Sequence, residues 1–134
     1  MSGGTGDVEA AQHAFYAALE RADVDAMAAL WDDQRPDGVS CVHPGWPAVH
    51  GRSQVLRSWA AVMASQEFVA VLLTDLRVAV DGDTAVVSCT ENVLAGSSGG
   101  GGAGASAATS VWRRRPLGWR LQAHHAGPLM ADGR

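Results

Sequence analysis

The first half of the chain carries apolar residues at intervals of three and four, the spacing that places them on one face of a helix. After Asp7, a residue type that caps helices well, this spacing predicts a helix over residues 8–22. Asp23 is expected to cap a second, short helix. A short strand over residues 39–43 and a third helix opening at Gly51 are predicted to follow.

The second half alternates apolar and polar residues, which is typical of half-buried strands. The alternation predicts four strands, over residues 68–80, 84–96, 105–115 and 118–126. Turn-forming residues separate them, and such short connections favour antiparallel hairpins. We therefore expect an α+β fold in which three N-terminal helices cover one face of a curved antiparallel sheet.

The length of 134 residues fits a single domain. We expect a disordered lead over residues 1–6, one domain over 7–130 and a short tail over 131–134. The glycine-rich stretch 95–106 has few side chains to pack, so it is interpreted as a mobile hairpin tip. A phosphate-binding role for this stretch is the weaker interpretation, because it has no lysine.

Charge and composition exclude several classes of function. All ten basic residues are arginine, so Schiff-base catalysis and a Walker-type phosphate loop are excluded. The net charge of −4 argues against a nucleic-acid partner. Cys41 and Cys89 lie in apolar stretches and are expected to be reduced core residues. We expect a cytoplasmic protein with no membrane partner, because the sequence shows neither the pattern of a signal peptide nor an apolar run of membrane-spanning length.

Three titratable residues fall on the apolar side of predicted strands. His43 follows Val39 and Cys41 at alternate positions, Glu91 follows Cys89, and His125 follows the alternating series that begins at Trp119. Unpaired carboxylates are costly to bury, and if these faces converge, the three groups form a polar cluster in an apolar cavity. The alternative is that each group lies near a strand end and hydrogen-bonds to backbone. His43, Glu91 and His125 are the candidate catalytic residues.

The segment CVHPGWPAVHG, residues 41–51, is predicted to form the rim of the cavity. Trp46 stands between prolines on a stiff loop, where it would cover the mouth, while His50 would lie outside. The other tryptophans lie on elements around the cavity and serve either as core or as ligand contacts; of these, the candidate ligand-binding residues are Trp31, Trp59 and Trp112.

The chain resembles the nuclear transport factor 2-like superfamily, in particular its SnoaL-like branch of small bacterial proteins. Three segments carry the resemblance in order: AFYAALERADVDAMAALW, CVHPGWPAVHGRSQVLRSW and SVWRRRPLGWRLQAHHAGP. The resemblance implies a conical, cystatin-like sheet wrapped around the helices, a pocket at its open end and a homodimer through the outer sheet face. Ketosteroid isomerases, polyketide cyclases, scytalone dehydratases and epoxide hydrolases share this fold, so it leaves the chemistry open.

Compared with ketosteroid isomerases, this chain departs from the catalytic set. Phe15 stands where they have an oxyanion-binding tyrosine, and Tyr16, one position off, would face elsewhere. His43 stands in place of the catalytic aspartate, and Ser110 in place of the second oxyanion-hole acid. Phe15 and Ser110 thereby join the candidate ligand-binding residues, and steroid isomerisation is not expected.

Two functions remain open. One is a protein that binds a small apolar molecule in a polar-tipped pocket; the other is an acid/base isomerase, cyclase or dehydratase in which His43 transfers the proton. Neither needs a cofactor. A metal site of two histidines and one carboxylate is chemically allowed by the same three residues, but their spacing is not a recognised one and no metal is expected.

Overall fold

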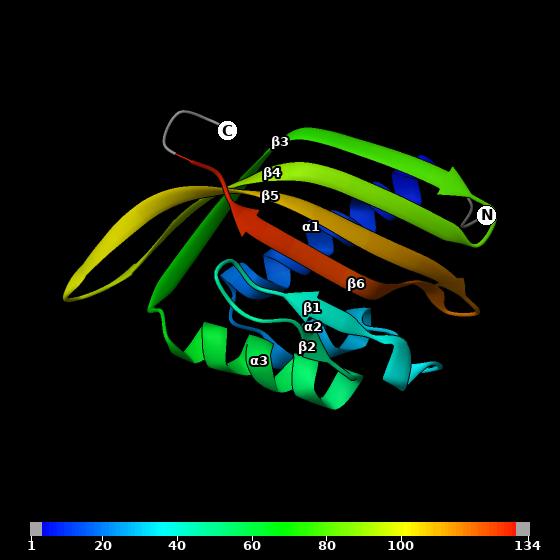
Figure 1. Cartoon of the computed structure of the whole chain (residues 1–134), viewed down its shortest axis with the longest axis horizontal. Coiled ribbons are helices and arrows are strands. Elements are labelled where there is room, and N and C mark those ends of the chain that lie inside the picture. The colour runs from blue at the N-terminus through cyan, green and yellow to red at the C-terminus, as the bar shows by residue number, and fades with distance from the viewer. Residues whose placement is uncertain (1–3, 131–134) are drawn as a thin grey trace.

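The computed structural model describes residues 4–130, which form three α-helices and a six-stranded sheet. In chain order the elements are α1 (Thr5–Glu20), α2 (Val24–Leu30), a 3-10 turn η1 (Pro36–Gly38), β1 (Ser40–Val42), β2 (Val49–His50), α3 (Arg52–Ala64), β3 (Phe68–Asp81), β4 (Thr84–Ser97), β5 (Gly100–Arg115) and β6 (Gly118–Pro128). The helices lie against one face of the long, curved strands (Figure 1). The expected α+β fold is confirmed.

Of the two predicted aspartate caps, one is confirmed and the other, Asp7, is wrong, because it lies in the first turn of α1 and the N-cap is Gly4. The Asp23 carboxylate accepts a hydrogen bond from the Ala26 N–H at 2.9 Å, which confirms it as the cap of α2. The first helix begins at Thr5, so the predicted disordered lead is wrong for residues 5 and 6. Residues 1–3 of that lead, and the predicted tail 131–134, lie outside the described residues.

The strand order is β2-β1-β6-β5-β4-β3, and all neighbours are antiparallel except one. Strand β1 runs parallel to β6, with Ser40 opposite Ala123 and Val42 opposite His125. The expectation of a wholly antiparallel sheet is wrong at this pair, because short connections constrain only strands that are consecutive in sequence. The parallel pair places the end of β1, and therefore His43, beside the second half of β6.

Two bulges bend the sheet around the helices. On β3 the register shifts between Thr74 and Arg77, where Asp75 adopts a left-handed backbone with φ of 51°. The β5–β6 ladder shifts after Val111, which pairs with Ala123, whereas the next pair is Trp112 with Leu121. An extra residue in one strand of a pair increases the local twist and bend. The sheet thus gains its concave face from these two irregularities.

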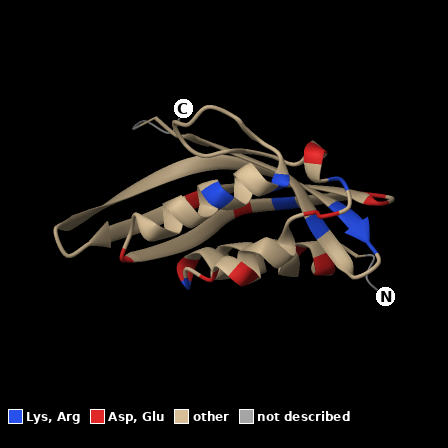
Figure 2. Ribbon diagram, turned by 90° about the horizontal axis from the view of Figure 1, so that it is seen from below, with Lys and Arg blue, Asp and Glu red and all other residues tan. Residues whose placement is uncertain are grey.

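The glycine-rich stretch 95–106 forms the end of the β4–β5 hairpin, as predicted, and most of it is paired strand. Strand β4 continues to Ser97 and β5 begins at Gly100, so only residues 98 and 99 turn the chain. A Cβ on Gly96 would lie 2.8 Å from the carbonyl oxygen of Gly100, so the close approach of the two strands requires glycine there. The hairpin extends beyond the rest of the sheet and carries no charged residue (Figures 1 and 2).

The core lies between α1, α2 and the concave face of the sheet. Its largest fully buried side chains include Phe15, Trp31, Trp112 and Leu121. Asp32 is a fully buried acid. Its carboxylate accepts two hydrogen bonds from the Arg115 guanidinium, at 2.8 and 2.9 Å. Within residues 4–130, no helix is long and apolar enough to cross a membrane.

Candidate functional site

A cavity of about 370 Å³ opens between α1, α3 and the concave face of the sheet. Most of its wall is apolar, with Leu19, Val62, Val69, Val71 and Val93 among the lining residues. Polar lining groups gather where β4 and β6 face the end of β1: Tyr16, His43, Glu91, Ser106 and His124. The cavity is therefore a mainly apolar pocket with a polar end, the usual form of a small-molecule site.

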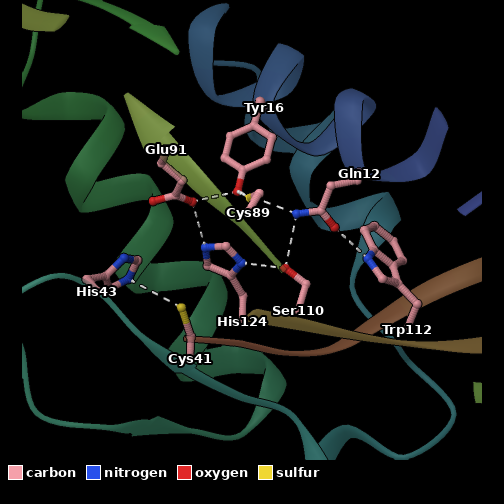
Figure 3. A network of polar contacts seen from close by, with 9 residues as sticks. All are labelled: Gln12, Tyr16, Cys41, His43, Cys89, Glu91, Ser110, Trp112 and His124. Carbon is pink, nitrogen blue, oxygen red and sulfur yellow. Dashed lines mark hydrogen bonds and ion pairs between the residues drawn. The ribbon is translucent and has the colours of Figure 1, made fainter. Parts of the chain in front are cut away.

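Glu91 is the acid of this polar end, and two donors hold it in place. Its Oε2 accepts a hydrogen bond from the Tyr16 hydroxyl at 2.5 Å and lies 3.2 Å from Nε2 of His124 (Figure 3). Burial alone would raise the pKa of Glu91, but the contacts with His124 and Tyr16 outweigh it and lower that pKa. At neutral pH Glu91 is thus a carboxylate. Its second oxygen is turned away from both partners (Figure 3).

A chain of hydrogen bonds beneath the cavity sets the direction of these contacts. The Trp112 indole N–H, which only donates, bonds to Oε1 of Gln12 at 2.7 Å and so fixes the orientation of that amide. The Gln12 amide then donates to the Ser110 hydroxyl at 3.1 Å, and Ser110 lies 2.7 Å from Nδ1 of His124. With the Ser110 O–H donating a hydrogen bond to Nδ1, the histidine carries its proton on Nε2, and this N–H donates to Glu91 (Figure 3).

His43 occupies the opposite side of the polar end, just beyond β1. Its Nε2 lies 2.8 Å from the Ser58 hydroxyl, and Ser58 donates its single proton to the Val55 carbonyl oxygen at 2.7 Å. The imidazole must therefore donate from Nε2, which leaves Nδ1 as an acceptor. Burial, together with the nearby His124, lowers the pKa of His43 to about 4 despite the opposing effect of Glu91. His43 is consequently neutral at pH 7.

The structure brings four of the nine predicted site residues to the cavity wall: His43, Trp46, Trp59 and Glu91. The loop carries Trp46 as expected, 43% exposed, with its ring centroid 4.7 Å from that of His43. The remaining predicted ligand contacts do not line the cavity but lie in the buried core around it: Phe15, Trp31, Ser110 and Trp112. As predicted, His50 is exposed outside.

The prediction for His125 is wrong, because the neighbouring His124 takes its place. His125 is exposed and its Nε2 lies 3.2 Å from the Ser40 hydroxyl, whereas His124 is 2% exposed and faces the cavity. The cause is the bulge between Leu121 and Ala123, which inserts Gln122 and reverses the alternation of the residues that follow. Simple alternation along β6 therefore fails after Leu121.

Tyr16 was expected to face elsewhere, and the structure contradicts this too. Both Phe15 and Tyr16 are buried, because α1 presses a wide face into the sheet. Gln12 was missed altogether. Its spacing of four residues from both Val8 and Tyr16 could have indicated it, since residues four apart share a helix face.

The described residues provide neither a metal-binding cluster nor an activated thiol. Within residues 4–130, no group of three histidine, cysteine or acidic side chains is arranged to hold a metal ion. Cys41 and Cys89 are both free and buried. Burial raises the pKa of the Cys41 thiol to about 12 despite the opposing effect of the Trp59 indole, so the thiol is not an activated nucleophile.

Comparison with known proteins adds context to this geometry. The family model for the SnoaL-like domain matches residues 8–131. A solved structure from Streptomyces avermitilis, provisionally named a dehydratase of the NTF2-like family, is 46% identical with a TM-score of 0.89; the match covers 95% of this chain and 96% of that one. No match was found among curated proteins.

Two further solved structures share the fold at lower identity. One, from Thiobacillus denitrificans and provisionally named a calcium/calmodulin-dependent protein kinase type II association domain, is 31% identical with a TM-score of 0.76, over 91% of this chain and 94% of that one. The other, an NTF2-like protein with a cystatin-like fold from Novosphingobium aromaticivorans, is 25% identical with a TM-score of 0.74, over 96% and 85%. The names of the three relatives differ widely, so the likeness leaves the function to be argued from the site.

Proposed function

The chain belongs to the SnoaL-like domain family of the NTF2-like superfamily, and from this premise we propose that it binds a small, mostly apolar molecule in the cavity described above. The observation that carries the proposal is the pairing of an apolar wall with a fixed carboxylate, Glu91, and a neutral imidazole, His43, at one end. Such a wall supplies affinity by burial, and the polar end orients the ligand. The volume of about 370 Å³ suits a molecule of two or three fused rings.

Trp46→Ala is expected to weaken ligand binding while leaving the fold nearly as stable as before. Trp46 is 43% exposed and stands on a loop, so its removal should change the melting temperature by only about 2 °C. A ligand at a hundred times its dissociation constant adds about 2.7 kcal/mol of stability, and the variant should lose most of this increment. Thermal unfolding with a panel of bicyclic and tricyclic alcohols, ketones and amines would measure both quantities.

Leu72→Ala is the matched control for this experiment, because Leu72 is 67% exposed on the sheet and does not line the cavity. The Leu72 variant should keep the full ligand-induced rise in melting temperature. A large fall in the melting temperature of the ligand-free Trp46 variant would instead assign Trp46 to the core and remove it from the site.

A second candidate function is the elimination of water from a β-hydroxy ketone. It is favoured by the 46% identity to the Streptomyces avermitilis protein provisionally named a dehydratase. In this reaction the free oxygen of Glu91 would take the proton from the carbon next to the carbonyl. The C–O bond of the hydroxyl would break, and the departing hydroxide would receive that same proton, which releases water and restores the carboxylate. His43 would accept a hydrogen bond from the substrate and orient it.

Glu91→Gln should slow such an elimination at least ~100-fold, since a glutamine amide cannot accept the proton. The probe is 4-hydroxy-4-phenylbutan-2-one, whose dehydration gives a conjugated ketone that absorbs in the ultraviolet. Glu9→Gln, on the exposed face of α1, is the control. Equal rates in the wild type and the Glu91 variant would reject the second function and leave the binding proposal standing.

A further inference from the structure

The polar end of the cavity is rich in acceptors and poor in donors. The Tyr16 hydroxyl and the His124 N–H both point at the same oxygen of Glu91, so neither proton is offered to a ligand. The His43 N–H is used by Ser58. Glu91 Oε1 and His43 Nδ1 remain, and among the described residues neither atom has a hydrogen-bond partner.

Of the other polar lining groups, Gln66 is exposed just after α3, and its amide donates as well as accepts. Ser106 lies opposite Glu91 in the β4–β5 register, and its hydroxyl can accept a hydrogen bond from a ligand as well as donate one. The Ser65 hydroxyl donates to the Val62 carbonyl oxygen. The indole N–H of Trp59 has no oxygen or nitrogen partner, but the atom is buried beneath the surface, so the cavity does not reach it.

Apart from His124, whose Nε2 lies 3.2 Å from Oε2, the Glu91 carboxylate has no ion-pair partner among residues 4–130. No arginine lines the cavity, and the chain contains no lysine. The carboxylate of Glu91 is held by two donors on one oxygen, while its second oxygen points away from both and has no hydrogen-bond partner among the described residues. A ligand that brings protons to this oxygen would satisfy it, whereas a ligand that brings only lone pairs would meet acceptors.

We propose that the cavity selects apolar molecules that donate hydrogen bonds, through a hydroxyl or an ammonium group, to Glu91 Oε1 and His43 Nδ1, and discriminates against molecules whose only polar group is a carbonyl. The inference rests on the proposed function, since it names the class of ligand for the same cavity. Hydroxyl and ammonium groups share the required chemistry and are separated by the experiment below. A site built of acceptors rejects an analogue that lacks the donor, because the buried acceptors of the site are then left without a hydrogen bond.

The test uses four molecules with one bicyclic skeleton: 2-aminotetralin, 2-tetralol, 2-tetralone and tetralin, titrated into the full chain by isothermal calorimetry at pH 7.5. The alcohol or the amine should bind at least tenfold more tightly than the ketone, and the ketone no more tightly than tetralin. Preference for the amine alone would identify charge as the recognised property. Similar affinities for amine and alcohol would identify hydrogen bonding.

Glu91→Gln sharpens the test because it should reverse the preference. The oxygen of the new amide must face Tyr16 and His124, which both donate, so its NH₂ group takes the place of Oε1 and becomes a donor to the ligand. The ketone should then bind at least tenfold more tightly than it binds the wild type, and the amine at least tenfold more weakly. Circular dichroism confirms that the variant is folded, and Glu9→Gln should keep the wild-type order.

Two results are distinguishable. If tetralin and its three derivatives bind equally well, or if Glu91→Gln leaves their order unchanged, the cavity binds apolar molecules but the inference about donors is overturned. If none of the four binds, the proposed function fails, and the inference falls with it.

Discussion

Phe15→Ala is expected to lower the free energy of unfolding by about 4 kcal/mol, the middle of the range for replacing a fully buried aromatic side chain with alanine. Phe15 has no exposed surface, and its ring lies 4.9 Å from Tyr16, 5.1 Å from Trp59 and 4.8 Å from His124, centroid to centroid. Three rings that belong to the cavity wall would lose their common support. The alanine variant leaves a hole that rigid neighbours on a helix and a strand cannot close.

Chemical denaturation measures this loss directly, and the melting temperature should fall by about 10–15 °C for a domain of this size. Phe15→Leu is the control, since it keeps most of the apolar volume and should cost about 1–1.5 kcal/mol. A Phe15→Ala variant that keeps its stability but loses ligand affinity would restore Phe15 as a ligand contact, which was its expected role from the resemblance.

Arg115→Leu is expected to lower the free energy of unfolding by about 3 kcal/mol at neutral pH, because it leaves the buried carboxylate of Asp32 without its cationic partner. Asp32 has no exposed surface and receives two hydrogen bonds from the Arg115 guanidinium. The matched control is Arg77→Leu. The ion pair of Arg77 with Asp75 is largely exposed on both sides, so its loss should change stability by no more than about 0.5 kcal/mol.

The cost of Arg115→Leu should also depend on pH. Hydrogen bonds from Arg115 lower the pKa of Asp32, backbone N–H groups add to this, and burial opposes it. A carboxyl whose pKa is lower in the folded state stabilises the protein above its unfolded pKa, about 3.9, and this contribution is lost as the pH falls through the folded value. The difference between wild type and variant should thus be largest near pH 7 and shrink below about pH 4. A constant difference from pH 7 to pH 2.5 would contradict this.

The residues that the sequence located correctly sit on regular strands before any irregularity. His43 follows the alternation of β1, and Glu91 follows that of β4, whose partner residues keep one register from end to end with β5. Period-two alternation is a reliable guide to a face wherever the ladder is unbroken. Trp46 was located by a different argument, since the prolines on either side of it stiffen its loop.

The argument from period-two alternation fails at His124. A bulge on β6 exchanges the faces of His124 and His125, yet the residues around it, Leu121-Gln122-Ala123, include no glycine or other turn former that would mark it. Bulges are set by the fit of one strand to its neighbour, and that information is not local. The hydrogen-bond chain from Trp112 through Gln12 could not be predicted from the sequence either, because it joins side chains 100 positions apart.

The single parallel pair of strands has a consequence for how the protein is made. On a ribosome, the helices and β1 emerge long before their neighbour in the sheet, since Ser40 must meet His125, 85 positions later in the chain. Nascent chains that end before β6 therefore contain the aromatic residues of the cavity rim but lack His124, Ala126 and the strand that pairs with β1. Closing so long a loop is entropically expensive and slows folding, so we expect the completed cavity to be a late product of synthesis.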